Sequence, residues 1–406
     1  MLWVGTAMKK LIRMALLGAL LRISCVYGVN FDDQLQQVIN QERAKYQINS
    51  ISLSVGLPTK NTIKNYVVGT ISKESKTPIK TNSLFQVGSI TKNFTAVLML
   101  QLVASGKVNL DAPIGKYFPE YPTWQTITVR QLLNHTSGIY DYIDEPHWWD
   151  RVAKNKNKVF EPKELLAIAY KHKPYFVANN GWHYSNTNYV LLGLIIEKIS
   201  AEPLSKSMSM LLKTAGMMDS YYLPVYSENL LRHMAHGYYL TFDNTKVNGS
   251  WGYGAAALVS TPHQLVMWVR ELFDGKILLP QSLKLLKSTV ALDTGKTTKN
   301  FATSAYGLGI FRMNTPAGVI WFTPGLTPGY RSLWVYMPCK GISFAYSASN
   351  CLIGVPFHEE MIQKIISTLL ADKSVQQDIA KYQRETALPS YCSQVKPAEK
   401  WSFVNL

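Results

Sequence analysis

The segments of this chain that are patterned as β-strands lie near its two ends, with helical segments between them. Near the start, strand-like runs at 51–57 and 62–69 flank a turn-like segment at 58–61, as the two arms of a hairpin do. Near the end, three further strand-like runs occupy 318–323, 331–338 and 342–348. A sheet that contains all of these strands has to be built from both ends of the chain.

Helical periodicity accounts for most of the remaining sequence. The spacing predicts an amphipathic helix over 32–47, a largely buried helix over 89–104 that Ser105-Gly106 ends, and a closing helix over 356–371. From about 107 to 250 the strand signal fades and short helical segments prevail, at 128–134, 162–171, 186–200 and 205–215. This middle part is typical of an inserted helical region.

Length and composition limit the class of protein. The 406 residues suit one large domain or two modules. A hydrophobic fraction of 47% and a charged fraction of 17% argue against a disordered chain. The net charge of +16 leaves nucleic acid, an anionic envelope surface or acidic substrates open as partners.

The first 28 residues have the pattern of a cleaved signal peptide. An apolar run at 14–21 follows three basic residues: Lys9, Lys10 and Arg13. The run is too short to span a membrane and Arg22 follows it directly. Lipidation at Cys25 is disfavoured because Arg22 stands where a lipobox needs an apolar residue. Cleavage after 28 would lower the net charge to +12, and it predicts export to the periplasm or the medium.

Cysteine and histidine usage indicates neither a disulfide-rich scaffold nor a metal site. Beyond the leader, Cys339, Cys351 and Cys392 allow at most one disulfide and one free thiol. The pair His233 and His236 lacks the companion ligands that a zinc hydrolase requires. We therefore expect no metal and no organic cofactor.

A serine and a lysine stand three residues apart at the start of the predicted buried helix. Ser89 and Lys92 would share one helix face, and a partly desolvated lysine is a base able to activate a serine hydroxyl. The same spacing recurs at Ser393 and Lys396, in a polar tail with no strand before it and no apolar helix after it. Context, rather than spacing, singles out Ser89.

The block from 85 to 92, Phe-Gln-Val-Gly-Ser-Ile-Thr-Lys, resembles the nucleophile motif of the serine beta-lactamase and penicillin-binding-protein superfamily. Its form is similar to the branch of class C beta-lactamases, D-alanyl-D-alanine carboxypeptidases and related esterases. Further blocks agree in order, at 132–138, 182–186, 256–261, 306–309 and 328–332. The resemblance covers roughly 32–370.

This resemblance implies an α/β (α+β) fold of the beta-lactamase/transpeptidase type, an antiparallel sheet flanked by helices with an inserted all-helical subdomain. It would place the hydrolase domain at 29–372, with the helical insertion at about 107–250. The polar residues at 373–406 form a tail to which the sequence assigns no structure.

The resemblance also implies roles for site residues. Ser89 would attack a carbonyl and Lys92 would share its proton. Tyr184 would act as a phenolate or as a relay to the leaving group, and Asn186 would bind Lys92 or a substrate amide. The backbone N–H groups of Ser89 and Leu326 would form the oxyanion hole.

The third motif of the family is where this sequence departs. The family has Lys or His, a small residue and Gly, whereas this chain has Thr323, Pro324 and Gly325. Thr323 can donate a hydrogen bond to a substrate but cannot supply the missing positive charge. Arg331, a short way along, is one candidate to replace that charge, and Lys296 is a rival.

We therefore expect an exported serine hydrolase that acts through a Ser89 acyl-enzyme on D-alanyl peptide or beta-lactam amides. Two alternatives stay open. One is an esterase on the same scaffold, which Thr323 favours because an ester needs no carboxylate anchor, and the other is a non-catalytic binder of cell-wall peptides. We expect a monomer with a small-molecule or peptide substrate, no nucleic-acid partner, and no membrane span once the leader is removed.

Overall fold

A computed structural model describes residues 30–59, 62–295, 304–351 and 355–401. The predicted leader at 1–28, with Cys25, and the rival cation Lys296 lie outside the described residues. At the centre is an eight-stranded sheet in the order β2-β1-β13-β12-β11-β10-β9-β8, with every neighbouring pair antiparallel. Its strands are β1 Ser50–Gly56, β2 Ile63–Gly69, β8 Val290–Ala291, β9 Ser304–Tyr306, β10 Phe311–Thr315, β11 Gly318–Thr327, β12 Tyr330–Met337 and β13 Ile342–Ala348.

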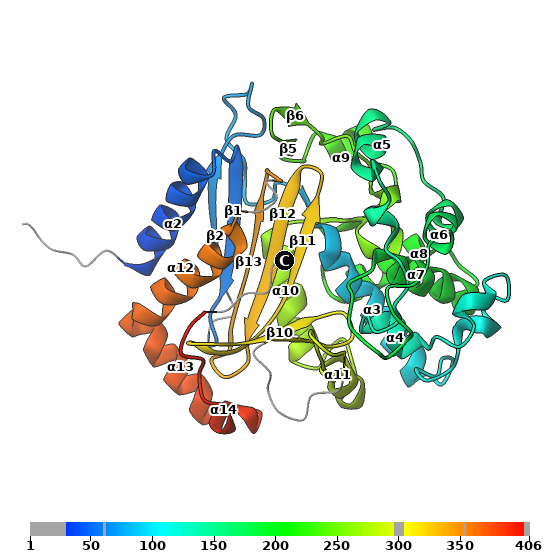
Figure 1. The fold of residues 1–406 in the computed structure, drawn as a ribbon. Helices are drawn as coiled ribbons and strands as arrows, with labels where there is room; N and C mark the ends of the chain where they lie inside the picture. The colour runs from blue at the N-terminus through cyan, green and yellow to red at the C-terminus, as the bar shows by residue number, and fades with distance from the viewer. Residues whose placement is uncertain (1–29, 60–61, 296–303, 352–354, 402–406) are drawn as a thin grey trace, which may run out of the picture.

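The two ends of the chain meet inside this sheet, as the sequence predicted. Strand β1 pairs with β13, with Ile51 opposite Ala348. Helices α2 Phe31–Lys45 and α12 Phe357–Ala371 cover one face of the sheet, and α10 Pro262–Phe273 packs on the other (Figure 1). Separate apolar cores fill the two faces, so the sheet is buried on both sides.

The predicted buried helix is α3, Thr91–Ala104, whose first ten residues are all buried. It begins directly after a short 3-10 turn, η1 Gly88–Ile90. Phe94 of α3 stacks on Trp268 of α10 with ring centroids 3.9 Å apart. Helix α3 therefore lies between the sheet side of the molecule and the helical region (Figure 1).

The inserted region is mostly helical and also contains three two-residue strands: β4 Tyr221–Tyr222, β5 Tyr238–Tyr239 and β6 Phe242–Asp243. Such short strands leave no alternation for a sequence pattern to detect. No helix in the described ranges is both long and apolar enough to cross a membrane. The remaining elements are β3 Phe85–Gln86, β7 Leu258–Ser260, η2 Ile114–Lys116, η3 Pro122–Trp124, α4 Val129–Leu133, η4 Tyr142–Asp144, α5 Trp148–Lys154, α6 Pro162–Tyr170, α7 Asn186–Ser200, α8 Leu204–Thr214, α9 Glu228–Leu231, η5 Gly249–Trp251, η6 Tyr253–Ala255 and α11 Pro280–Leu286.

The tail that the sequence left unassigned forms two helices, α13 Lys373–Glu385 and α14 Tyr391–Gln394. Val375 and Ile379 of α13 are buried against the core beneath α12. This helix is polar overall and carries one narrow apolar stripe, and its low hydrophobicity is why the sequence assigned no structure to it.

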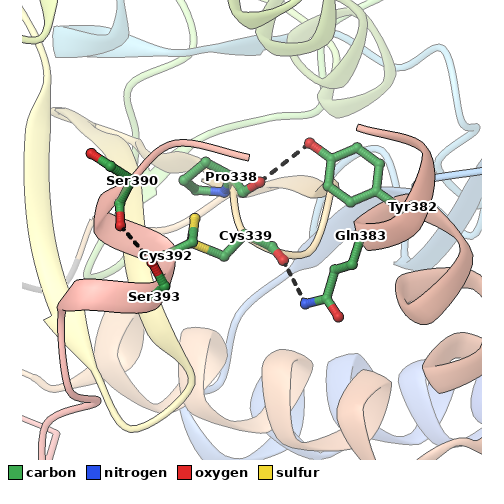
Figure 2. Close-up of a disulfide and its surroundings, with 7 residues drawn as sticks. All are labelled: Pro338, Cys339, Tyr382, Gln383, Ser390, Cys392 and Ser393. Carbon is green, nitrogen blue, oxygen red and sulfur yellow. Dashed lines mark hydrogen bonds between the residues drawn. A yellow bond between two sulfur atoms is a disulfide. The ribbon is translucent and has the colours of Figure 1, made fainter. Parts of the chain in front are cut away.

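A disulfide between Cys339 and Cys392 ties this tail to the turn that joins β12 to β13 (Figure 2). Two hydrogen bonds support it. The Tyr382 hydroxyl donates to the Pro338 carbonyl at 3.2 Å, and Gln383 Nε2 donates to the Cys339 carbonyl at 2.9 Å (Figure 2). Cys351 is the free, buried thiol.

Removing this disulfide should lower the free energy of unfolding. The bridge spans 53 residues of sequence, and a closed loop of that size constrains the unfolded chain by about 2–4 kcal/mol. The double variant Cys339→Ser/Cys392→Ser should therefore unfold at lower urea than the wild type. Equal urea midpoints for the wild type with and without reducing agent would contradict this expectation.

Candidate active site

The turn that carries Ser89 touches strand β11 backbone to backbone. Gly88 has φ +52°, and a Cβ there would lie 2.6 Å from the carbonyl oxygen of Leu326. A Cβ on Gly325 would lie 1.9 Å from the Val87 carbonyl oxygen and 3.2 Å from the backbone nitrogen of Ser89. Glycine is required on both sides of this contact. The contact places the backbones of Ser89 and Leu326, the two expected oxyanion donors, on segments that face each other.

Lys92 lies one turn further along, buried with an exposed fraction of 1%. Its Nζ donates to Ser89 Oγ at 3.0 Å, to Asn186 Oδ1 at 2.6 Å and to the Ala255 carbonyl at 3.2 Å. Burial lowers the pKa of Lys92 to about 7, against a smaller opposing effect of Asp141. Near neutral pH this amine is therefore a base within reach of the Ser89 hydroxyl.

Tyr184 completes the cluster that the sequence predicted. Lys92 Nζ lies 4.6 Å from the centroid of its ring. Burial, with a smaller contribution from Tyr306, raises the pKa of Tyr184 well above its usual value, although a hydrogen bond with Ser89 opposes the shift. Of the two forms that the sequence left open, this environment favours the neutral phenol over the phenolate.

His135 packs against Tyr184 with ring centroids 4.4 Å apart. Its Nδ1 accepts a hydrogen bond from the backbone N–H of Ser185 at 3.2 Å. Burial first, and then the nearby Lys92, keep the pKa of His135 well below its usual value. The imidazole is neutral and braces the loop before α7.

The structure adds one polar residue that the sequence did not single out. Asp141 Oδ2 accepts a hydrogen bond from Asn186 Nδ2 at 2.8 Å. Its exposed fraction is 3%, and burial raises its pKa to about 7. No spacing relates Asp141 to Ser89 or Lys92. Its position three residues after the block at 132–138 is the one signal that could have drawn attention to it.

Thr323 occupies the position of the missing cation. It lies on β11 two residues before Gly325, so both face the η1 side of the sheet. Its hydroxyl is buried and has no hydrogen-bond partner within the described part of the chain. Strand β10 pairs with β11 only as far as Phe322. In the described part of the chain, Pro324 therefore has a partner strand only on the β12 side.

The suggestion that Arg331 replaces the missing charge is wrong. In register Arg331 lies opposite Leu326 on β11, one residue out of phase with Gly325, so it faces the other side of the sheet. Its guanidinium is buried and lies 5.8 Å from the ring centroid of Phe357 in α12. The other candidate, Lys296, lies outside the described residues.

The histidine, cysteine and acidic side chains were the candidates for a metal site. In the described ranges, His, Cys, Asp and Glu side chains do not gather in groups of three or more. His236 pairs with Asp243 at 2.7 Å, and His233 Nδ1 lies 2.8 Å from the Asn229 carbonyl. The polar groups around Ser89 are amine, amide, phenol and carboxyl groups that bond to one another.

Comparisons with known proteins agree with this geometry. The Beta-lactamase family model matches residues 35–369. Penicillin-binding protein 4* of Bacillus subtilis is 28% identical over 326 residues, covering 74% of this chain and 68% of that protein. The putative penicillin-binding protein PbpX of the same species is also 28% identical, but the match spans 58% of its length.

Solved structures share the fold over most of both chains. The D-amino acid amidase of Ochrobactrum anthropi SV3 superposes with a TM-score of 0.75 at 25% identity, covering 84% of this chain and 99% of that one. A D-stereospecific amidohydrolase from Streptomyces has a TM-score of 0.71 at 27% identity, covering 82% and 97%. A class C beta-lactamase in complex with cefoxitin, at 21% identity and a TM-score of 0.69, covers 83% and 98% and shares the fold.

These matches confirm the predicted fold and the predicted family. The order of motifs, the two-faced antiparallel sheet and the Ser89–Lys92 cluster between sheet and helices all fit one superfamily. The chain belongs to the beta-lactamase family, within the superfamily of serine beta-lactamases and penicillin-binding proteins.

Proposed function

We propose that this protein is a serine hydrolase that cleaves amides through an acyl-enzyme on Ser89. One observation carries the proposal: a buried amine with a pKa of about 7 lies 3.0 Å from the serine hydroxyl. A serine that merely starts a helix has no need of a buried lysine at its hydroxyl. Burial of an unpaired ammonium is costly, and the shifted pKa supplies a base where the chemistry needs one.

The steps follow from the positions of the groups. Neutral Lys92 accepts the Ser89 proton as Oγ attacks the substrate carbonyl carbon. The backbone N–H groups of Ser89 and Leu326 stabilise the resulting oxyanion. Tyr184 passes a proton to the leaving nitrogen and recovers one from Lys92, the C–N bond breaks, and the acyl group stays on Ser89. Water then attacks the ester and restores the serine.

The neutral state of Tyr184 decides how it takes part. A phenol whose pKa is raised by burial cannot be the resting base, but it can donate its proton while it accepts another. Its ring lies over Lys92 and its hydroxyl bonds with Ser89, so it can connect the two groups. We assign the base to Lys92 and the relay to Tyr184.

The substrate class follows from Thr323. Neither Thr323 nor Arg331 places a cation beside Ser89, so a free carboxylate on the leaving group would lack that partner. Small amides of D-amino acids meet this condition better than D-alanyl peptides with a free C-terminus. Two of the structural neighbours are described as acting on D-amino acid amides or as D-stereospecific amidohydrolases. Beta-lactam amides and small esters are further candidate substrates. Thr323 is compatible with ester hydrolysis, because an ester needs no carboxylate anchor.

Export by the leader at 1–28, to the periplasm or the medium, is part of the proposal. The disulfide between Cys339 and Cys392 supports it, because structural disulfides persist in oxidising compartments. The surplus of basic residues suits an anionic envelope. We propose that the mature protein acts there as a monomer.

Replacing Ser89 by Ala should abolish turnover of D-phenylalanine amide and of a short nitrophenyl ester, with a loss of about 1,000-fold or more. Labelling by a fluorescent penicillin should disappear with it. Ser393→Ala is the matched control, because Ser393 has the same spacing to a lysine but lies in the exposed tail. A binder without turnover would show neither Ser89-dependent hydrolysis nor a covalent adduct.

The pH dependence should reflect Lys92. Below its pKa of about 7, Lys92 is an ammonium ion and cannot accept the serine proton, so kcat/KM should fall about tenfold per pH unit on the acid side. Lys92→Met should remove this limb together with most of the activity. A wild-type profile with no acid limb near pH 7 would contradict the assignment of the base to Lys92.

Thr323→Lys tests the departure from the family motif. A lysine there should increase kcat/KM for substrates whose leaving group carries a free carboxylate, by about 10-fold, and leave neutral amides nearly unaffected. Steady-state rates on a D-alanyl dipeptide and on its C-terminal amide would give this comparison. Equal changes for both substrates would show that Thr323 does not face the leaving group.

A further inference from the structure

We infer that Asp141 is a positioning residue that acts through Asn186 to orient and hold the Lys92 amine. The inference rests on the proposed role of Lys92 as the base. Asp141 contacts neither Ser89 nor the place that the attacked carbonyl would occupy. The three side chains form one chain of hydrogen bonds from the loop before η4, through the start of α7, to α3.

The first step is the geometry of the bridging amide. Asn186 Oδ1 accepts from Lys92 Nζ at 2.6 Å, and Asn186 Nδ2 donates to Asp141 Oδ2 at 2.8 Å. If the amide were flipped, its NH2 group would face the lysine donor and its oxygen would face the carboxylate. Both contacts would then be repulsive when the pair is charged, so Asp141 selects the orientation that presents an acceptor to Lys92.

The second step is that the carboxyl group is itself fixed in place. Asp141 precedes η4, and its Oδ1 accepts from the backbone N–H of Ile143 at 3.3 Å. The backbone N–H of Asp141 donates to the Tyr175 hydroxyl at 3.1 Å. Exposed fractions are 3% for Asp141, 3% for Asn186 and 1% for Lys92, so water does not compete for these hydrogen bonds.

The third step is the balance of charges around the pair. Burial raises the pKa values of the surrounding tyrosines and lowers that of the imidazole, so these groups are neutral near pH 7: Tyr140, Tyr142, Tyr175, Tyr184, Tyr189 and His135. Asp144 is exposed, accepts a hydrogen bond from the Tyr175 hydroxyl and adds to the rise in the pKa of Asp141. The Asp141 carboxylate opposes the effect of burial on the pKa of Lys92. Lys92 and Asp141 therefore titrate as a linked pair inside one buried site.

Replacing Asp141 by Asn removes the charge of the side chain and keeps its shape. The new amide can still accept the hydrogen bond from Asn186 Nδ2, but it carries no charge. Lys92 then loses the carboxylate that favours its ammonium form, and its pKa falls. The acid limb of kcat/KM should move to lower pH by about 0.5–1 unit, with little change in KM. Asp141→Ala also removes the hydrogen-bond acceptor that orients the Asn186 amide. Lys92 is then held less firmly, so kcat should fall.

The experiment compares pH profiles of the wild type, Asp141→Asn, Asp141→Ala and Asp150→Asn on D-phenylalanine amide. Asp150→Asn is the matched control, because it removes an exposed carboxylate that pairs with His147 and not with the Asp141 hydrogen-bond chain, so the limb should stay in place. A limb that stays fixed in Asp141→Asn, or that moves equally in Asp150→Asn, would overturn the inference while leaving the serine hydrolase intact.

A second readout needs no turnover. Lysine labelled with carbon-13 at Cε reports its own titration by NMR, and loss of one signal in Lys92→Met assigns Lys92. The Lys92 titration midpoint should drop in Asp141→Asn and stay in Asp150→Asn. An unchanged midpoint in both variants contradicts the inference even if the protein hydrolyses nothing. If the wild type shows no Ser89-dependent turnover but the Lys92 midpoint shifts in Asp141→Asn, only the proposed function is contradicted.

Discussion

The site depends on the burial of one amine. Lys92 stands in the first turn of a helix whose first ten residues are all inside the protein, so its side chain has no route to bulk water. That burial brings its pKa to about 7 and makes a lysine useful at neutral pH. The aromatic rings around it, the Ala255 carbonyl and the Asn186 amide together hold a group that changes its charge in the proposed mechanism.

The second requirement is a close approach of two backbones. Gly88 and Gly325 allow η1 and β11 to touch without side chains between them, so the nucleophile comes from the helical side and its oxyanion partner from the sheet. A side chain at either glycine would push the two layers apart at the place where the proposed mechanism puts the substrate carbonyl. The relative position of sheet and helices is therefore a property of the site as much as of the fold.

Much of this arrangement could be predicted from the sequence. Long apolar segments such as α3, α7 and β11–β13 are clear in the sequence, and the order of motifs brought Ser89, Lys92, Tyr184 and Asn186 together. The face of the sheet on which a side chain lies was harder to predict. Arg331 is only six residues from Gly325 in the chain yet points to the opposite face of the sheet, because it pairs with Leu326 and is therefore one residue out of phase with Gly325. Asp141 was missed because the folded chain, not sequence spacing, brings it to Asn186.

The pairing of β1 with β13 also has a consequence for how the chain reaches its native state. Ile51 pairs with Ala348, so nearly the whole domain is made before β1 has its second neighbour. Until then the hairpin of β1 and β2 exposes an unpaired edge of apolar residues, which is a template for association with other chains. Contacts of such long sequence separation form slowly. Shielding of this edge until β13 pairs with β1 would therefore limit association between incompletely folded chains.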